Sequence, residues 1–315
     1  MDATTGFESW AAKYVRQGRV IDWQQEGVSH SEGQAWGLLL AQVAGDRDCF
    51  EEIESWTAAN LAVRQDRLMG WRRWPEIGEV ECHTATDGDL FRAWALLRAD
   101  RDQGWTGHLD TAIAIARDIA DLCLVPDPRF GDQLLISPGT KARRGPERVL
   151  MNPSYVMPRA LRELGEAAGD PRLTRAADHG EAVLLELVEA ARMWDWIDVT
   201  TESFAEALEH RAGWGFDALR VPLYLAWSER RDHPAVSAGL SMMEDDAQCG
   251  HVVVRRSGRG LVEKESDHPG FLAIPDVVRC QPLSAASVNS SSYYADTLRM
   301  LAAVAQYEGG CALPS

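Results

Sequence analysis

The chain has 315 residues, of which 45% are hydrophobic and 25% are charged, a composition typical of a globular protein that buries a sizeable core. Its formal net charge is −16, from 48 acidic and 32 basic side chains, which argues against nucleic acid or an anionic membrane as the main partner. A neutral ligand fits this charge better.

The start of the chain carries two helical patterns. Apolar side chains recur at helical spacing over residues 7–16, and Gly18 ends the pattern. The second pattern begins at Ser29 or Ser31, whose side chains can accept from the free N–H groups of a first turn, and it continues through Trp36, Leu39, Leu40 and Val43. Glu32 then lies in the first turn of a mostly buried helix. A carboxylate there is favoured by the helix dipole, so Glu32 either caps the helix or belongs to a site.

Helical periodicity continues along the chain, with Pro, Gly, Asp or Ser at the breaks. It covers residues 46–61, 87–99, 108–124, 155–168, 171–193, 217–227 and 294–307. Strand signals are confined to residues 134–136 and 252–255, which could form short strands in loops. Because no linker or low-complexity segment interrupts the pattern, the sequence predicts an all-α fold and a single domain over residues 1–315.

Asp87 and Asp217 each stand where a predicted helix begins. An N-cap is the structural interpretation for either aspartate alone. If alternate helices run the same way around a ring, however, their N-termini converge on one face and Glu32, Asp87 and Asp217 share a cleft. Glycoside cleavage needs such an arrangement, with one protonated carboxyl to donate to the leaving oxygen and one carboxylate to act opposite it.

The six cysteines, at positions 49, 82, 123, 249, 280 and 311, show no CxxC or Cys/His spacing, so we expect no metal site and no cofactor. Cys249 and Cys280 flank a region with Gly, Asp and Pro, and they could pair.

No run of about 20 apolar residues occurs, so the sequence predicts no membrane span. The first residues carry neither the basic region nor the apolar region of a signal peptide. The protein is therefore expected to be cytoplasmic, or exported with a signal peptide that this sequence lacks.

Five motifs stand in order along the chain: GRVID at residues 18–22, SHSEGQ at 29–34, ATDGDL at 85–90, NPSY at 152–155 and FDALRVP at 216–222. Together they resemble the motifs of glycoside hydrolase family 8, and the resemblance runs from about Trp10 to Tyr307. It is nearest to the bacterial endoglucanases associated with cellulose synthesis. The resemblance implies an (α/α)6 barrel of six helical hairpins, with an open cleft across the end where the inner helices start.

The resemblance also implies roles for named residues. Glu32 matches the general acid, Asp217 the base that activates water, and Asp87 a carboxylate that holds and distorts the sugar at the cleavage point. Arg220 matches a residue that positions the base. Residues matching the cleft are Tyr155, Tyr294 and, as a stacking platform, Trp71. An aromatic residue on the apolar face of a helix can instead pack in the core. Both interpretations, sugar stacking and core packing, apply to many of the twelve tryptophans.

Two positions depart from the family pattern. Phe216 stands where a tyrosine commonly precedes the base, and Glu81-Cys82-His83 replaces an Asn-rich segment before the Asp87 motif. Both changes alter contacts at the sugar subsites, where Phe216 is a candidate substrate-binding residue. Neither change touches the acid or the base.

The expected function is that of an endo-β-1,4-glucanase acting on cellulose-type glucan with inversion. Chitosanase, xylanase or lichenase activity is the alternative within the family, and an acidic chain suits cationic chitosan. A second class of function is a catalytically idle glycan-binding subunit of a polysaccharide-synthesis assembly. Intact Glu32 and Asp217 favour the enzyme, since a binding module needs no acid and base together.

An inverting hydrolase needs room for a water between its base and the anomeric carbon. Its two carboxyls lie about 6.5 to 9.5 Å apart, against about 5 to 5.5 Å in a retaining enzyme. Because Glu32 and Asp217 come from different helices, the sequence predicts inversion. Like charges in a partly desolvated cleft disfavour double ionisation, so we expect the acid and the base to titrate as a coupled set.

The expected partner is a β-1,4-glucan, with a further association with a cellulose-synthesis system implied by the resemblance. Because a polymer of the cellulose class is not met inside the cell, the expected location is the periplasm or the outside of the cell.

Overall fold

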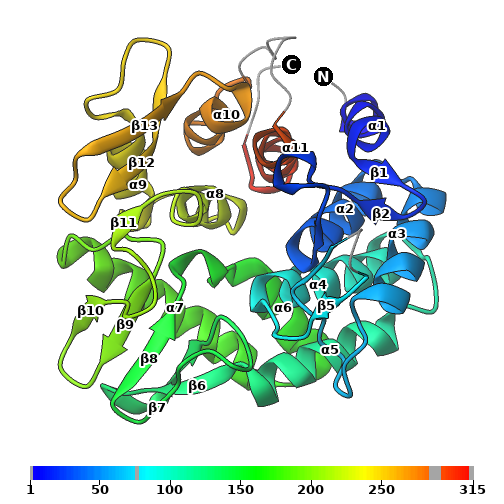
Figure 1. Cartoon of the computed structure of the whole chain (residues 1–315), viewed down its shortest axis with the longest axis horizontal. Helices are drawn as coiled ribbons and strands as arrows, with labels where there is room; N and C mark the ends of the chain where they lie inside the picture. The colour runs from blue at the N-terminus through cyan, green and yellow to red at the C-terminus, as the bar shows by residue number, and fades with distance from the viewer. Residues whose placement is uncertain (1–2, 75–77, 284–291, 312–315) are drawn as a thin grey trace.

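A computed structural model of the chain describes residues 3–74, 78–283 and 292–311. Eleven α-helices lie in these residues, and they form an inner ring with further helices packed outside it (Figure 1). The inner helices are α2 (Ser31–Ala44), α4 (Thr86–Gln103), α6 (Pro158–Ala168), α8 (Arg220–Trp227), α10 (Pro269–Val278) and α11 (Tyr293–Glu308). Each packs against the next in this order, and α11 closes the ring on α2.

The remaining helices lie outside the ring. They are α1 (Ala3–Tyr14), α3 (Arg47–Asn60), α5 (Leu109–Leu122), α7 (Pro171–Glu189) and α9 (Pro234–Glu244). Helix α3 packs on α2, α5 on α4, α7 on α6 and α9 on α8, while α1 packs on α11 and α2. Helix α10 packs against both α8 and α11. This alternation of inner and outer helices confirms the predicted all-α class.

Thirteen short strands lie in the connections of the described chain and form five small antiparallel sheets. The longer strands are β6 (Leu124–Asp127), β7 (Phe130–Ile136), β8 (Arg148–Met151), β9 (Ile197–Thr200), β10 (Phe204–Glu206), β12 (Val252–Ser257) and β13 (Val262–Ser266). Two-residue strands are β1 (Val15–Arg16), β2 (Arg19–Val20), β3 (Ser29–His30), β4 (Arg72–Arg73), β5 (Val80–Glu81) and β11 (Gly213–Trp214). The predicted strands at 134–136 and 252–255 are confirmed within β7 and β12. The others were not predicted, because a segment of two to five residues shows too little alternation to mark a strand.

Histidines begin three of the helices. The Nδ1 atom of His30 accepts the N–H of Gly33 at the start of α2, and His233 and His268 cap α9 and α10 in the same way. The predicted cap at Ser29 or Ser31 is therefore wrong for α2. Sequence analysis missed α9 and α10 altogether, since histidine is not among the usual N-cap residues that mark a helix start.

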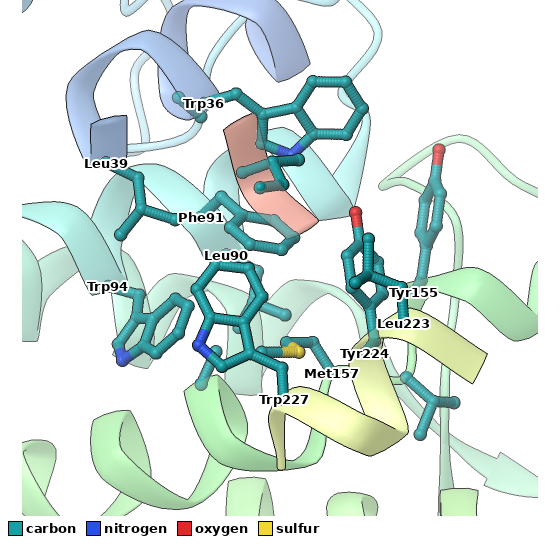
Figure 2. Close-up of a cluster of buried hydrophobic side chains, with 14 of the residues drawn as sticks. Trp36, Leu39, Leu90, Phe91, Trp94, Tyr155, Met157, Leu223, Tyr224 and Trp227 are labelled. Carbon is teal, nitrogen blue, oxygen red and sulfur yellow. The ribbon is translucent and has the colours of Figure 1, made fainter. Parts of the chain in front are cut away.

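Aromatic side chains fill the ring. Trp36 enters from α2, Phe91 and Trp94 from α4, and Tyr224 and Trp227 from α8 (Figure 2). All five are buried, so for these tryptophans the core interpretation holds. The hydroxyls of Tyr155 and Tyr224 point to the same side, away from Trp94 and Trp227 (Figure 2). The interior is thus apolar at one end and carries polar groups at the other.

Beyond the apolar tryptophan rings, ion pairs join the helices at that end of the ring. The guanidinium of Arg98 on α4 donates to both carboxylate oxygens of Glu308 on α11. The indole N–H groups of Trp227 and Trp94 donate to Glu308 and Glu163, at 2.9 and 2.8 Å. Because these charges are paired and also accept from tryptophan, their burial is compensated, and the helix ends are held together there.

A disulfide joins Cys280, just after α10, to Cys311, just after α11. The pairing of Cys249 with Cys280, which the sequence left open, is therefore not formed, and Cys249 is an exposed free cysteine. The sequence separation of the bonded pair is 31 residues. The bond joins the C-terminal ends of α10 and α11, which run side by side in the same direction.

Replacing both bonded cysteines, as Cys280→Ser with Cys311→Ser, is expected to lower the free energy of unfolding by about 3 kcal/mol, because the unfolded chain regains the entropy of the opened loop. Urea unfolding followed by circular dichroism measures the change. The matched control is Cys82→Ser with Cys249→Ser, since both residues are exposed and unpaired. An equal loss of stability in the two double variants would contradict the assignment.

Candidate active site

The N-terminal ends of the inner helices meet at one end of the ring. Glu32 is the second residue of α2 and Asp87 the second of α4, while Asp217 lies three residues before α8. All three carboxylates lie around the side chain of Arg220, the first residue of α8. The predicted convergence of the three acids on one face is thereby confirmed.

Arg220 is the centre of this cluster. Its side chain is 2% exposed, and its Nη1 atom donates to Glu32 Oε2 and lies 3.7 Å from Asp87 Oδ2. Its Nη2 atom donates to Asp217 Oδ1 at 2.5 Å and to Ser154 Oγ at 2.9 Å. One guanidinium thus contacts carboxylates from three helix starts. The sequence resemblance predicted only its contact with the base.

The NPSY motif, residues 152–155, binds the side chain of Arg220. The hydroxyl of Ser154 accepts from Arg220 and donates to Asn152 Oδ1 at 2.8 Å. Asn152 Oδ1 also accepts the backbone N–H of Ser154 at 3.0 Å, so it caps the short 3₁₀ turn Pro153–Tyr155. The motif therefore fixes the orientation of Arg220 from the connection that leads into α6.

Helix α4 approaches α2 closely because residue 88 is glycine. A Cβ atom at Gly88 would lie 2.7 Å from Ser31 Oγ and 2.8 Å from the backbone N of Glu32, closer than side-chain carbons are found. The missing side chain lets the start of α4 touch the start of α2. Asp87 and Glu32 are brought together in this way.

Glu32 is not the capping residue of α2. The cap is His30, whose Nε2 atom lies 3.9 Å from Asp22 Oδ2 of the GRVID motif. The N–H of Ser31 donates to Trp71 O at 2.8 Å, so two backbone N–H groups at this end of α2 have partners other than Glu32. The carboxylate of Glu32 is left to face Arg220, and the capping interpretation is wrong.

Burial and mutual repulsion favour protonated carboxyls in this cluster. Burial, followed by the charge of Glu32, raises the pKa of Asp87 to about 7, although Arg220 acts in the opposite direction. Burial also raises the pKa of Asp217; Arg220 opposes this, and the charge of Asp87 adds to it. The side chains of Glu32 and Asp217 are 19% and 29% exposed and that of Asp87 only 7%. Solvent therefore reaches the first two, while Asp87 lies beneath them.

Aromatic residues surround the carboxylates. Tyr155 is buried, and burial together with the charges of Asp87 and Asp217 raises its pKa. The hydroxyl of Tyr294 donates to the backbone oxygen of Phe216, and the two rings meet edge to face at 5.5 Å. Phe216 brings no hydroxyl to the neighbourhood of Asp217, in contrast to the tyrosine of the family pattern.

Trp71 lies in a bend before β4 and is half-buried, so it does not belong to a helical stripe. The guanidinium of Arg72 lies 3.9 Å from its ring centre, and the ring of His83 lies 4.9 Å away. Glu81 accepts from Arg72 Nε at 2.6 Å. The segment Glu81-Cys82-His83, which departs from the family pattern, therefore supplies neighbours of the Trp71 side chain: His83 directly, and Glu81 through Arg72.

Sequence analysis missed residues beside Asp217. Asp195, between α7 and β9, accepts two backbone N–H groups of the segment that carries Asp217. Next to it, the rings of Trp196 and His210 stack at 4.1 Å with 9° between their planes, and Trp196 meets Tyr155 edge to face. The one available signal was an aspartate between two tryptophans after a helix end. This pattern has no general meaning without the fold.

Two features of the described residues bear on other functions. Within the described residues, no three His, Cys, Asp or Glu side chains gather where they could hold a metal ion. Among the helices described, none combines the length and the apolar composition needed to cross a bilayer.

Comparisons with known proteins agree with this geometry. The sequence profile of the family described as glycosyl hydrolases family 8 matches residues 2–248. A probable endoglucanase of Novacetimonas hansenii is 30% identical over an alignment of 328 positions that covers 96% of this chain and 91% of the relative.

Two solved structures are similar over almost their whole length. The endo-beta-1,4-glucanase CMCax from Acetobacter xylinum gives a TM-score of 0.83 at 28% identity and is covered to 98%, as is this chain. Endoglucanase Cel10, a family 8 glycosyl hydrolase from Klebsiella pneumoniae, gives 0.85 at 25% identity, with 96% of this chain and 99% of that chain covered. The expected (α/α)6 barrel is confirmed by these likenesses.

Replacing Asp87 with asparagine tests whether this carboxyl keeps a proton in the folded protein. Its pKa is about 7 in the folded chain and about 3.9 in an unfolded one. Between these values the folded state holds a proton that the unfolded state has lost, so rising pH favours unfolding of the wild type. We expect Asp87→Asn to gain stability relative to the wild type from about pH 4 to about pH 7, by up to about 4 kcal/mol, and then to stay level.

Urea unfolding at each pH measures this difference. Asp170→Asn is the control of opposite sign, because a hydrogen bond from Arg172 lowers the pKa of Asp170. Its contribution to stability is lost as the pH falls, so the control variant loses stability relative to the wild type as the pH rises. A constant difference between Asp87→Asn and the wild type would contradict the prediction.

Proposed function

The chain belongs to glycosyl hydrolase family 8, and from this membership we propose that it is an endo-β-1,4-glucanase acting on cellulose-type glucan. It is a glycoside hydrolase, and inversion of the anomeric configuration is general to the family. The observation that carries the proposal is the binding of Glu32 and Asp217 by the two ends of one buried guanidinium. We take residues 1–315 as one catalytic domain.

We assign the general acid to Glu32. Its carboxyl is partly exposed at the start of α2 and neighbours Asp87. Burial and the charge of Glu32 raise the pKa of Asp87 to about 7, so the electrostatics of the cluster oppose ionisation of all its carboxyls. In the proposed role, Glu32 gives its proton to the glycosidic oxygen.

We assign the base to Asp217. Arg220 holds one carboxylate oxygen, which leaves the other for a water molecule. In an inverting reaction this water attacks the anomeric carbon from the face opposite to the leaving group and gives its proton to the carboxylate. The carboxyl separation typical of an inverting pair stays a prediction for this chain.

The sugar-binding roles follow from position. Asp87, beneath Glu32, is proposed to hold the sugar at the cleavage point, and Arg220 to position the base. Aromatic rings around the carboxylates are proposed to contact the sugars, since such rings pack on the apolar faces of pyranoses. They are Tyr155, Trp71, Tyr294 and Phe216.

We place the protein in the periplasm or outside the cell. The Cys280–Cys311 disulfide supports this location, because disulfides persist in oxidising compartments. A polymeric glucan is also met there. Association with a cellulose-synthesis system, implied by the sequence resemblance, stays a prediction.

Reducing-end release from four polymers tests the proposed function. We expect the wild type to cleave soluble carboxymethyl cellulose with a higher kcat/KM than xylan, lichenan or chitosan. Glu32→Gln and Asp217→Asn are each expected to lower kcat by about 10²- to 10⁴-fold with the fold intact, because proton donation or water activation is lost. Asp46→Asn, at the cap of outer helix α3, is the control with unchanged kcat. Faster cleavage of chitosan, or near-normal kcat in either site variant, would contradict these assignments.

The stereochemistry of the first product gives a separate test. Proton NMR of the reaction at early times is expected to show the α-anomer, since water replaces a β-linked leaving group from the opposite face. Mutarotation then produces the equilibrium mixture. Initial release of the β-anomer would mean that Asp217 acts as a nucleophile.

A further inference from the structure

Asp195 fixes the segment that carries Asp217. Its carboxylate Oδ1 atom accepts the backbone N–H of Gly215 at 2.9 Å and that of Ala218 at 2.8 Å. Its own backbone N–H donates to Gly213 O at 2.8 Å. Asp217 thus lies between two amides that hold the same carboxylate oxygen.

The fit between Asp195 and this segment is close. A Cβ atom at Gly215 would lie 2.6 Å from Asp195 Oδ2, so only glycine admits the carboxyl at this distance. Beyond the turn, the N–H of Leu219 donates to Gly215 O and that of Arg220 to Asp217 O, both at 3.0 Å. The contact with Asp195 is therefore continuous with the first turn of α8.

We propose that Asp195 is a positioning residue for the general base, because its carboxyl holds the turn that keeps Asp217 against Arg220 and opposite the acid. This inference rests on the proposed function, in which Asp217 activates the water. A displacement of about 1 Å at a reacting group costs about 100-fold in rate, so an anchor on both sides of the base affects turnover. Asp195 itself touches neither sugar nor water in this role.

The charge of Asp195 is not needed for this task. Burial, then the charge of Asp217, raises the pKa of Asp195 to about 7, against the opposing effects of the two backbone N–H groups and Arg220. Below that pH the side chain is a neutral carboxylic acid whose Oδ1 still accepts. Asparagine has the same shape and an equivalent oxygen, so it should replace Asp195, whereas it could not replace a residue that accepts a proton from water.

Four variants separate these roles when kcat and KM on carboxymethyl cellulose are measured near pH 6. We expect Asp195→Ala to lower kcat by about 30- to 100-fold with KM within about twofold, since the base moves while the sugar contacts remain. Asp195→Asn is expected to keep kcat within about threefold of the wild type. Gly215→Ala, which pushes on Asp195 Oδ2, is expected to behave like Asp195→Ala.

Asp46→Ala is the matched control, because Asp46 also accepts a backbone N–H, from Cys49 at 3.0 Å, but on outer helix α3. It is expected to lower the melting temperature without changing kcat. A loss of stability alone therefore does not imitate the effect expected of Asp195→Ala.

The outcomes are distinct. Equal and large losses of kcat in Asp195→Asn and Asp195→Ala would overturn the positioning role and make Asp195 a proton acceptor. Unchanged kcat in Asp195→Ala would overturn the inference alone. A wild type without glucanase activity, or full activity in Asp217→Asn measured alongside, would overturn the proposed function and the inference with it.

Discussion

The structure depends on one electrostatic constraint, the confinement of three carboxyl groups around the buried guanidinium of Arg220. One positive charge cannot balance three negative charges, and an uncompensated buried charge costs several kcal/mol. One proton reduces this excess without removing it, and burial and the charge of Glu32 favour a proton on Asp87 by raising its pKa to about 7. The same constraint that opposes full ionisation therefore favours a retained proton in the cluster, which the proposed acid catalysis requires.

The remainder of the fold keeps this cluster in place. Helices α2, α4 and α8 start at the site, and their aromatic side chains fill the ring behind it (Figure 2). At the other end, Arg98 and Glu308 tie α4 to α11 by paired charges. Because the interior is close-packed between these ends, the helix starts cannot drift apart without opening cavities. The end of the ring that holds the three carboxylates can therefore contain charges that repel one another, because the packing and the ion pairs elsewhere in the ring stabilise the fold.

Local sequence pattern predicted the inner helices other than α10, and the three acids, because apolar periodicity and an acidic residue at a helix start are both properties of neighbouring residues. The features that it did not predict depend on residues distant in sequence. Asp195 acts on amides about 20 positions away, and Cys280 bonds Cys311 rather than Cys249 because α10 and α11 pack together. The cap at His30 was missed for a different reason. A cap was predicted at this helix start, but it was assigned to a neighbouring serine. A histidine that accepts through Nδ1 carries no sign of this role in its sequence neighbours.

The proposed acid and base are held asymmetrically, and this asymmetry bears on how they are coupled. Glu32 is held from its helix, through the His30 cap and the contact of Ser31 with Trp71 O. Asp217 lies before its helix, in a turn whose backbone is bound by Asp195. Both contact Arg220, whose Nη1 and Nη2 atoms bind the two carboxylates separately. In the proposed reaction Asp217 takes a proton from water, which weakens its hold on the guanidinium and leaves more of the positive charge to Glu32. Because Arg220 contacts both carboxylates, it is proposed to link the two proton transfers of a single inverting step.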